Sequence, residues 1–120
     1  MDELKLYDGE FKFATIVWEN EPLASGELVN LSAEKLGWKK STVYTVLKKL
    51  CERNILKNQD SVVTAIVKKD DVQKYESEAI LEKVFDGSLP KFIASFLDEK
   101  RLSEKEVREI QEILNKSRKG

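Results

Sequence analysis

Residues 38–50 read Trp-Lys-Lys-Ser-Thr-Val-Tyr-Thr-Val-Leu-Lys-Lys-Leu, and this stretch predicts one short helix with two chemically different sides. The i, i+3, i+4 and i+7 positions of one helical stripe are occupied by Val43, Val46, Leu47 and Leu50. At about 100° per residue, the opposite side carries Ser41, Tyr44, Thr45, Lys48 and Glu52, with Thr42 and Lys49 on its flanks. We therefore expect the apolar stripe to face a core and the polar side to face outward.

The segment around this helix is basic, although the whole chain has a net charge of −1. Between residues 35 and 57 the only anion is Glu52, against seven cations, which gives a local net charge of +6: Lys35, Lys39, Lys40, Lys48, Lys49, Arg53 and Lys57. Hydroxyl and ammonium groups donate hydrogen bonds to phosphates and base edges, so the pattern favours a nucleic-acid interface. The alternative is an ordinary surface helix with lysines outside.

Length and composition exclude several classes of protein. A chain of 120 residues holds one compact domain, or a small domain with an appendage. No apolar run approaches the roughly 20 residues that span a bilayer, and the opening Met-Asp-Glu is unlike a secretory signal, so we expect a cytoplasmic protein without membrane insertion. The chain has no histidine and a single cysteine, Cys51, which argues against an enzyme, a zinc site or any cofactor. We expect Cys51 to be a half-buried packing residue.

The first 69 residues follow the order of a winged helix. We expect a first helix over residues 8–20 with Asp8 as its N-cap, and a second helix ending at Gly37 and capped by Ser25. The helix over residues 40–53 then completes a helix-turn-helix, with Trp38 as a packing residue in the turn. A hairpin follows, with strands over residues 55–57 and 62–67 and a turn over residues 58–61.

Residues 70–120 are predicted to be helical again. A first helix begins with Asp70 and Gln73 in capping-box spacing, and a third begins with Ser103 and Glu106. The later segments carry apolar stripes that are too extensive for 50 residues to bury alone, so we expect a dimerisation region using Leu89, Phe92, Ile93, Phe96, Leu97, Val107, Ile110 and Leu114. The alternative is that these helices fold back on the winged helix. The expected fold class is mainly α with a small β-hairpin wing.

Three parts of the chain carry a resemblance to a known family. These are the first helix ending in Ile16-Val17-Trp18, the stretch from Gly37-Trp38 through Ser41-Thr42-Val43-Tyr44-Thr45, and the segment from Val84-Phe85-Asp86-Gly87 to Leu114. In these motifs, and over nearly its whole length, the chain resembles the BlaI/MecI penicillinase-repressor family, which also includes the copper-responsive CopY repressors. The copper branch needs a cysteine-rich tail that residues 116–120 lack, so copper sensing is not expected.

The resemblance implies a homodimeric repressor that binds palindromic double-stranded operator DNA upstream of antibiotic-resistance genes. It also implies release by cleavage in the dimerisation region, caused indirectly by a membrane sensor protease, at a bond that falls on Ser95 and Phe96. Together with the basic patch, it predicts these DNA-binding residues: Lys39, Lys40, Ser41, Thr42, Tyr44, Thr45, Lys48 and Lys49. The chain departs from the family at three places. Lys39 replaces the usual Ser cap, and Ser95 replaces the commoner Asn. The wing tip at residues 58–60 reads Asn-Gln-Asp, where the family is expected to have a basic tip.

Two other functions stay open on the sequence. The near-neutral total charge and the acidic wing also suit a winged helix that binds proteins and not DNA. A repressor that senses a small ligand at its dimer interface is the second.

Overall fold

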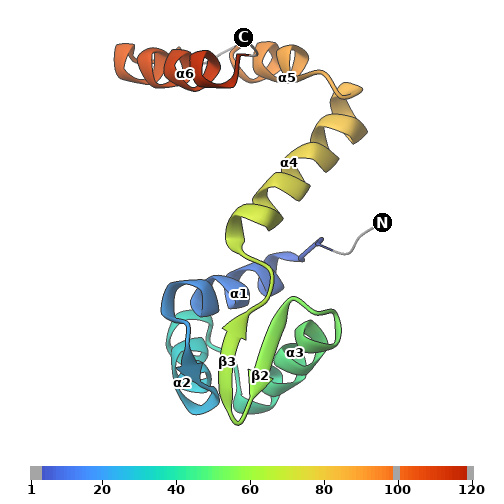
Figure 1. Cartoon of the computed structure of the whole chain (residues 1–120), viewed down its shortest axis with the longest axis vertical. Coiled ribbons are helices and arrows are strands. Elements are labelled where there is room, and N and C mark those ends of the chain that lie inside the picture. The colour runs from blue at the N-terminus through green and yellow to red at the C-terminus, as the bar shows by residue number, and fades with distance from the viewer. Residues whose placement is uncertain (1–3, 99–100, 119–120) are drawn as a thin grey trace. The chain divides into compact units, whose positions relative to one another are not determined.

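The computed structural model describes residues 4–98 and 101–118. By its internal contacts the chain divides into two units, residues 1–79 and residues 80–120. The division lies within a helix, beyond the boundary at residues 69 and 70 that the sequence suggests. The elements, shown in Figure 1, are α1 (Asp8–Asn20), β1 (Leu23–Ala24), α2 (Ser25–Leu36), α3 (Lys40–Glu52), β2 (Leu56–Gln59), β3 (Val62–Ala65), α4 (Lys69–Phe85), α5 (Leu89–Phe96) and α6 (Glu104–Ser117).

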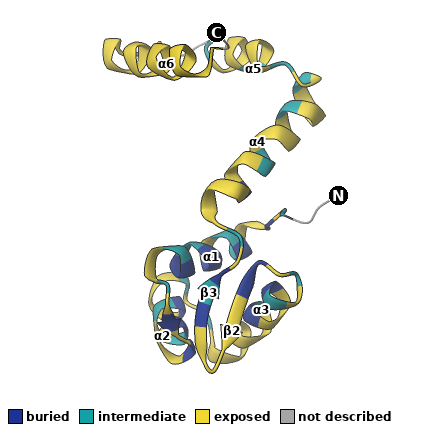
Figure 2. Cartoon of the chain, viewed as in Figure 1, coloured by how far each residue is buried: buried dark blue, intermediate teal, exposed yellow. Residues whose placement is uncertain are grey.

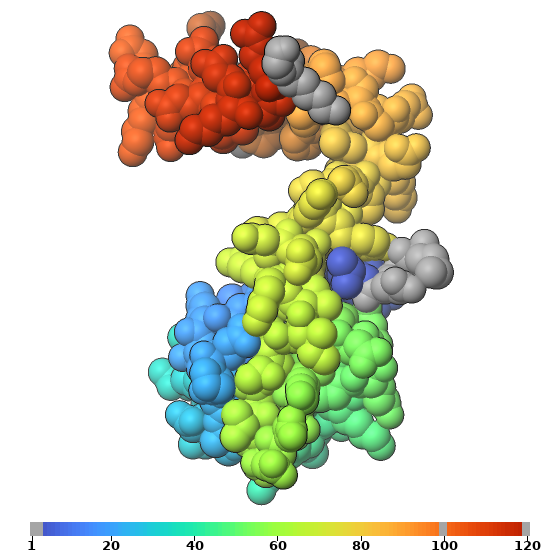
Figure 3. All heavy atoms as spheres, in the orientation of Figure 1, coloured from blue at the N-terminus to red at the C-terminus, as the bar shows by residue number. Residues whose placement is uncertain are grey.

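The first unit is a winged helix, which confirms the predicted fold class of mainly α structure with a small hairpin. Its hairpin belongs to a three-stranded antiparallel sheet with the order β1-β3-β2. Strand β1 pairs Leu23 with Val63 and Ala24 with Val62, a strand that the sequence analysis did not predict because two residues show no alternation. On the face in Figure 3, the hairpin (yellow-green) lies between the blue α1–α2 region and the green α3.

One hydrophobic core joins the three helices and the sheet of the first unit. The predicted edge of α1 is buried, with Phe13 and Val17 fully covered and Ile16 nearly so. Leu56 of β2 and Val63 of β3 close the core from the sheet side, together with Ile55, which lies just before β2 and not within it as predicted. Figure 2 shows this burial as the dark blue segments of α1, α3 and the strands. At about 0.8 kcal/mol for each buried CH₂, this cluster is the main source of the unit's stability.

Two helix N-caps lie one residue earlier than predicted. The N-cap of α1 is Tyr7 and not Asp8, and the N-cap of α2 is Ala24 and not Ser25. In each case a glutamate at the third helical position accepts the backbone N–H of the cap: Tyr7 N–H donates to Glu10 Oε1 at 3.0 Å, and Ala24 N–H donates to Glu27 Oε1 at 3.1 Å. The glutamate half of a capping box is thus sufficient to fix these helix starts.

The hairpin turn is tighter than predicted. Only Asp60 and Ser61 form the turn, both with left-handed φ values of 54° and 64°, whereas Asn58 and Gln59 belong to β2 and pair with Val63 and Val62. Strand β3 ends at Ala65 and not at Val67. A two-residue turn with both φ values positive matches the twist of a hairpin, which is why the strands extend further into the predicted loop.

Helix α4 also begins differently from the prediction. It starts at Lys69, and its N-terminal backbone contact joins Lys68 N–H to Asp71 Oδ2 at 3.2 Å, in place of the expected pair of Asp70 and Gln73. Val72, one turn later, is fully buried in the core of the first unit. The helix ends as predicted, because Asp86 and Gly87 both have positive φ values.

In the second unit α6 begins where predicted, and neither α5 nor α6 has a buried residue. Ser103 Oγ accepts the N–H of Glu106 at 3.1 Å, and Glu106 accepts the N–H of Ser103 at 3.1 Å, which confirms the predicted capping box. Ser88 Oγ caps α5 by accepting the N–H of Lys91. Figure 2 accordingly shows α5 and α6 in yellow over nearly their whole surface.

Candidate nucleic-acid interface

Helix α3 has one buried side and one exposed side, as its sequence predicts. Val43, Leu47 and Leu50 are buried in the core, and Val46 packs against it from the edge. The opposite side is exposed, and we call it the polar face of α3: Ser41, Tyr44, Thr45, Lys48 and Glu52. The flanking residues Lys39, Lys40, Thr42 and Lys49 are exposed as well. The fold therefore brings all eight predicted DNA-binding residues to the surface of one helix and its N-cap.

The turn before α3 fixes the helix against the rest of the unit. Gly37 adopts the left-handed φ of 70° that ends α2, as predicted. The Trp38 ring stacks on Phe13, with ring centroids 5.4 Å apart and an interplanar angle of 16°. Trp38 is thus a packing residue, as predicted. A Cβ atom on Gly9 would lie 3.3 Å from the Trp38 ring, so α1 approaches the turn closely. Lys39 is the N-cap and is exposed; its ammonium group cannot accept a hydrogen bond, so its side chain does not cap the helix.

Two hydroxyl groups of the polar face already have protein partners. Thr45 Oγ1 donates to Ser41 O at 2.9 Å, and its oxygen keeps the capacity to accept a hydrogen bond. Tyr44 OH donates a long hydrogen bond of 3.5 Å to Ser25 Oγ, at the start of α2. Ser25 N–H in turn donates to Ser61 O in the hairpin turn at 2.9 Å. Tyr44 therefore connects α3 through α2 to the tip of the wing.

Lys49 lies on the α1 side of α3, apart from the polar face. Its ammonium group is 3.1 Å from Glu10, whose carboxylate is also 3.5 Å from Arg53 Nη1. Glu10 is only 7% exposed. Its burial by itself raises the pKa of the carboxyl, but the hydrogen bond from Tyr7 N–H and the cations of Lys49 and Arg53 outweigh this effect, so the pKa of Glu10 lies below its ordinary value.

This cluster around Glu10 was not predicted from the sequence. The available signal was the position of Glu10, which precedes Phe13 and Val17 by three and seven residues and so places a carboxylate on the apolar stripe of α1. An acidic group at such a position needs cationic partners. Lys5, Tyr7, Lys49 and Arg53 line a cleft of about 220 Å³ beside it, which we call the basic cleft.

The other flank of α3 faces the wing. Cys51 is half-buried there, as predicted, and burial raises the pKa of its thiol despite an opposing hydrogen bond from the backbone of Asn58. With Tyr44, Leu47, Lys48 and Asn58 it lines a hollow of about 390 Å³. The wing carries one cation, Lys57, and one anion, Asp60, so the hairpin adds little net charge to the interface.

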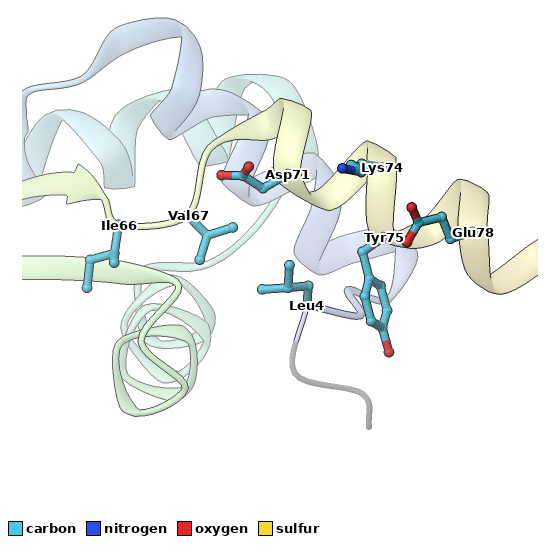
Figure 4. A pocket seen from close by; sticks show the side chains of 7 residues that line it. All are labelled: Leu4, Ile66, Val67, Asp71, Lys74, Tyr75 and Glu78. Carbon is cyan, nitrogen blue, oxygen red and sulfur yellow. The ribbon is translucent and has the colours of Figure 1, made fainter. Parts of the chain in front are cut away.

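A further hollow of about 330 Å³ lies at the base of α4 in the first unit. Figure 4 shows Leu4 between Val67 and the ring of Tyr75, with Ile66, Asp71, Lys74 and Glu78 completing the lining. Its lining combines four apolar or aromatic side chains with three charged ones. The part of α4 that lines it is held by the burial of Val72 and by Asp71 at the helix start.

In the second unit, the predicted dimerisation residues lie mostly at the surface. Phe96 is 53% exposed, and five others are exposed with it: Leu89, Ile93, Val107, Ile110 and Leu114. Phe92 and Leu97 are half-buried, and Phe92 packs edge-on against Phe85 at 5.4 Å between ring centroids. Ser95 is exposed and precedes Phe96 in the last turn of α5.

No group of three or more histidine, cysteine, aspartate or glutamate side chains in residues 4–98 and 101–118 is arranged to hold a metal ion. Within the same ranges, no helix combines the length and hydrophobicity needed to traverse a bilayer.

The sequence model of one family, described as penicillinase repressor, matches residues 8–116. This chain belongs to the penicillinase repressor family. The family is one of repressors and not of enzymes, which agrees with the prediction from the missing histidines. The penicillinase repressor of Bacillus licheniformis is 23% identical over 121 residues, covering 96% of this chain and 94% of that protein. The methicillin resistance regulatory protein MecI of Staphylococcus aureus is 21% identical over 116 residues, covering 93% of this chain and 94% of that protein.

A solved structure resembles the fold. It is the solution structure of the Bacillus licheniformis BlaI monomeric form in complex with the blaP half-operator, with a TM-score of 0.50 and 18% identity. The match covers 56% of this chain and 87% of that chain. At this identity the likeness shows the winged-helix fold alone. What this chain does with that fold is inferred from its own residues.

Proposed function

We propose that this penicillinase repressor family member is a transcriptional repressor that binds double-stranded operator DNA through the polar face of α3. The observation that carries the proposal is the two-sided burial of α3. Val43, Leu47 and Leu50 fix the helix in the core, while hydroxyl and ammonium groups project from the other side. The complex of the related BlaI with a half-operator supports the same use of the fold.

Each group of the interface has a separate role in this proposal. Ser41, Thr42, Tyr44 and Thr45 approach base edges from the major groove, because short polar side chains on a recognition helix reach that depth. Lys39, Lys40 and Lys48 neutralise phosphates and fix the position of the helix without reading sequence. The local net charge of +6 gives the binding its salt dependence, because each neutralised phosphate releases counterions.

The test is fluorescence anisotropy with a random duplex at increasing salt, followed by selection of bound sequences from a random pool. We expect measurable affinity for the random duplex at low salt that falls linearly on a log–log plot, and a palindromic consensus from the selection. A winged helix that binds only proteins would show no affinity for the random duplex even at the lowest salt. That result would remove the proposal and favour the alternative.

We further propose that residues 70–120 form the dimerisation region and set the spacing of two half-sites. The support is the extent of exposed apolar surface on α5 and α6, because contiguous patches of this kind on small proteins mark interaction sites. A second copy of the chain is the partner that also explains a palindromic operator. Sedimentation equilibrium over a wide concentration range tests this point: a monomer at every concentration would contradict it.

Release from DNA, in the same proposal, follows cleavage between Ser95 and Phe96. Ser95 and Phe96 are exposed at the last turn of α5, a helix of only 8 residues. A protease needs an extended segment, and the end of so short a helix opens at small cost. Mass spectrometry of the repressor from induced cells should find a fragment ending at Ser95. Intact repressor during full induction would contradict this route of release.

A further inference from the structure

The basic cleft lies between the segment that precedes α1 and the last turns of α3. Lys5 and Tyr7 come from the first of these, Lys49 comes from the last turn of α3, and Arg53 is the C-cap of that helix. A water molecule occupies about 30 Å³ in the liquid, so a cleft of about 220 Å³ holds a phosphate group together with a few waters.

The cleft carries an excess of positive charge around one aromatic ring. The ammonium groups of Lys5 and Lys49 lie 5.3 Å and 6.0 Å from the centroid of the Tyr7 ring, within the range of a cation–π interaction. Arg53 Nη2 donates to Lys5 O at 2.6 Å, which ties the two sides of the cleft together. Glu10 is the carboxylate that contacts Lys49 and Arg53, so three cations and one anion leave a net charge of +2.

The position of the cleft on α3 relates it to the polar face. Lys49 follows Lys48 by about 100° around the helix, and Arg53 lies one turn beyond Lys49. The opposite flank carries Tyr44 and Cys51, which line the hollow next to Asn58 of β2. The cleft is therefore on the side of α3 away from the wing.

A helix in the major groove has a row of phosphates on each side. The groove is about 12 Å wide and a helix with its side chains is about 10–12 Å across, so both flanks of a recognition helix approach the DNA backbone. The wing occupies one flank of α3. On the other flank the basic cleft is the cationic feature that faces the expected row of phosphates.

We propose that the basic cleft binds a backbone phosphate of the bound duplex, with Lys5, Lys49 and Arg53 as cationic contacts and the Tyr7 hydroxyl as a hydrogen-bond donor. The inference rests on the proposed function and adds the segment before α1 to the DNA interface. Glu10 holds Lys49 and Arg53 in place, and the Tyr7 ring places the Lys5 ammonium beside them. Such a contact carries affinity and no sequence information.

The test compares the full-length parent with Lys5→Ala, Lys12→Ala and Lys48→Ala in salt titrations of duplex binding. Lys5→Ala removes the ammonium group and keeps the backbone carbonyl that Arg53 uses. Lys12→Ala is the matched control, because Lys12 is exposed on α1 about 200° around the helix from Glu10 and loses the same charge. We expect Lys5→Ala to lower affinity about five- to tenfold for operator and random duplex alike, and to reduce the salt slope by about 1. Lys12→Ala should match the parent.

The outcomes separate the cleft from the rest of the interface. If Lys48→Ala weakens binding but Lys5→Ala matches the parent, the basic cleft is a structural ion cluster only, and the inference falls while the proposed function stands. If the parent binds no duplex, both the inference and the proposed function fall.

Tyr7→Phe, which keeps the ring, should weaken binding about two- to threefold through loss of one hydrogen bond. If inorganic phosphate shifts the amide signals of residues 5–7 while Lys5→Ala leaves duplex affinity unchanged, the cleft takes a free phosphate and not DNA, which also overturns the inference.

Discussion

The Nζ atom of Lys49 lies 3.1 Å from Oε2 of Glu10, so an ion pair joins the last turns of α3 to the first turn of α1. Lys49 is 57% exposed at its side chain, whereas the Glu10 side chain is only 9% exposed. The two partners therefore differ in how much they depend on the ion pair. The buried carboxylate depends on its cations, while Lys49 keeps a surface that faces solvent.

The first prediction concerns the pH dependence of this pair. Because the folded-state pKa of Glu10 is below its ordinary value of 4.5, its contribution to stability is present above that value and is lost as the pH falls through the lowered pKa. Glu10→Gln should therefore lower the melting temperature at pH 7, and the difference from the parent should shrink below pH 4.5. Thermal unfolding followed by circular dichroism at each pH measures the two melting temperatures. Glu19→Gln, an exposed change on the same helix, should have no such effect, and a constant difference at every pH would contradict the assignment.

The second prediction concerns Lys48, whose ammonium group lies on the polar face. Lys48→Ala should weaken binding to operator and random duplex by a similar factor, about five- to tenfold, and reduce the salt slope by about 1. Lys83→Ala on α4 removes the same charge from an exposed helical position and serves as the control. Anisotropy titrations at several salt concentrations give both quantities. A slope equal to that of the parent would remove Lys48 from the phosphate contacts.

The third prediction concerns sequence preference. Thr45→Val keeps the shape of the side chain but removes the hydroxyl that is proposed to meet a base edge, so it should reduce discrimination between operator and random duplex by about fivefold, or about 1 kcal/mol. Thr15→Val is a matched control, because Thr15 Oγ1 donates to Phe11 O in α1 just as Thr45 Oγ1 donates to Ser41 O in α3. Equal discrimination by Thr45→Val and the parent would show that Thr45 does not read sequence.

The fourth prediction concerns Ser32, which is fully buried in α2. Its hydroxyl has no hydrogen-bond partner among the described residues. Ser32→Ala removes an unsatisfied polar group and favours the helix, so it should raise the free energy of unfolding by about 1 kcal/mol. Ser77→Ala on the exposed side of α4 should change it by only a few tenths. Urea denaturation distinguishes the two. A loss of stability in Ser32→Ala would indicate a buried partner for the hydroxyl, such as an ordered water.

The fifth prediction concerns self-association. Ile110→Lys places a charge in the apolar stripe of α6 and should shift the proposed dimer to monomer, because an unpaired charge in an interface core is costly. Glu112→Lys introduces the same group about 160° around the helix and should leave the dimer intact. Sedimentation velocity on both variants checks the difference. If Ile110→Lys sediments like the parent, α6 does not contribute its apolar stripe to the interface.

The sequence predicted the helical elements well because their apolar periods are long. Val43, Leu47 and Leu50 in α3, and Phe13 and Val17 in α1, are buried as the 3.6-residue period requires. The starts of α1 and α2 were misplaced by one residue, because Asp8 and Ser25 are common caps whereas the observed caps use Glu10 and Glu27. In both helices the side chain at the third position determined the start, and the identity of the cap residue did not.

Pairing between distant segments was harder to predict. Strand β1 exists because Leu23 and Ala24 meet Val63 and Val62, which are about 40 residues away in the chain, and two residues have no period of their own. The cluster of Glu10 with Lys49 and Arg53 depends in the same way on the packing of α1 against α3. Periodicity placed Lys49 at the edge of the polar face, but only the three-dimensional fold paired it with Glu10.

The most direct measurement of the central claim is an NMR titration of the isotopically labelled protein with a selected operator duplex. The account predicts that the largest amide shifts fall on α3 at Ser41, Tyr44, Thr45 and Lys48, with smaller shifts at residues 5–7. Shifts confined to residues 80–120, or no shifts at a stoichiometric amount of duplex, would contradict it.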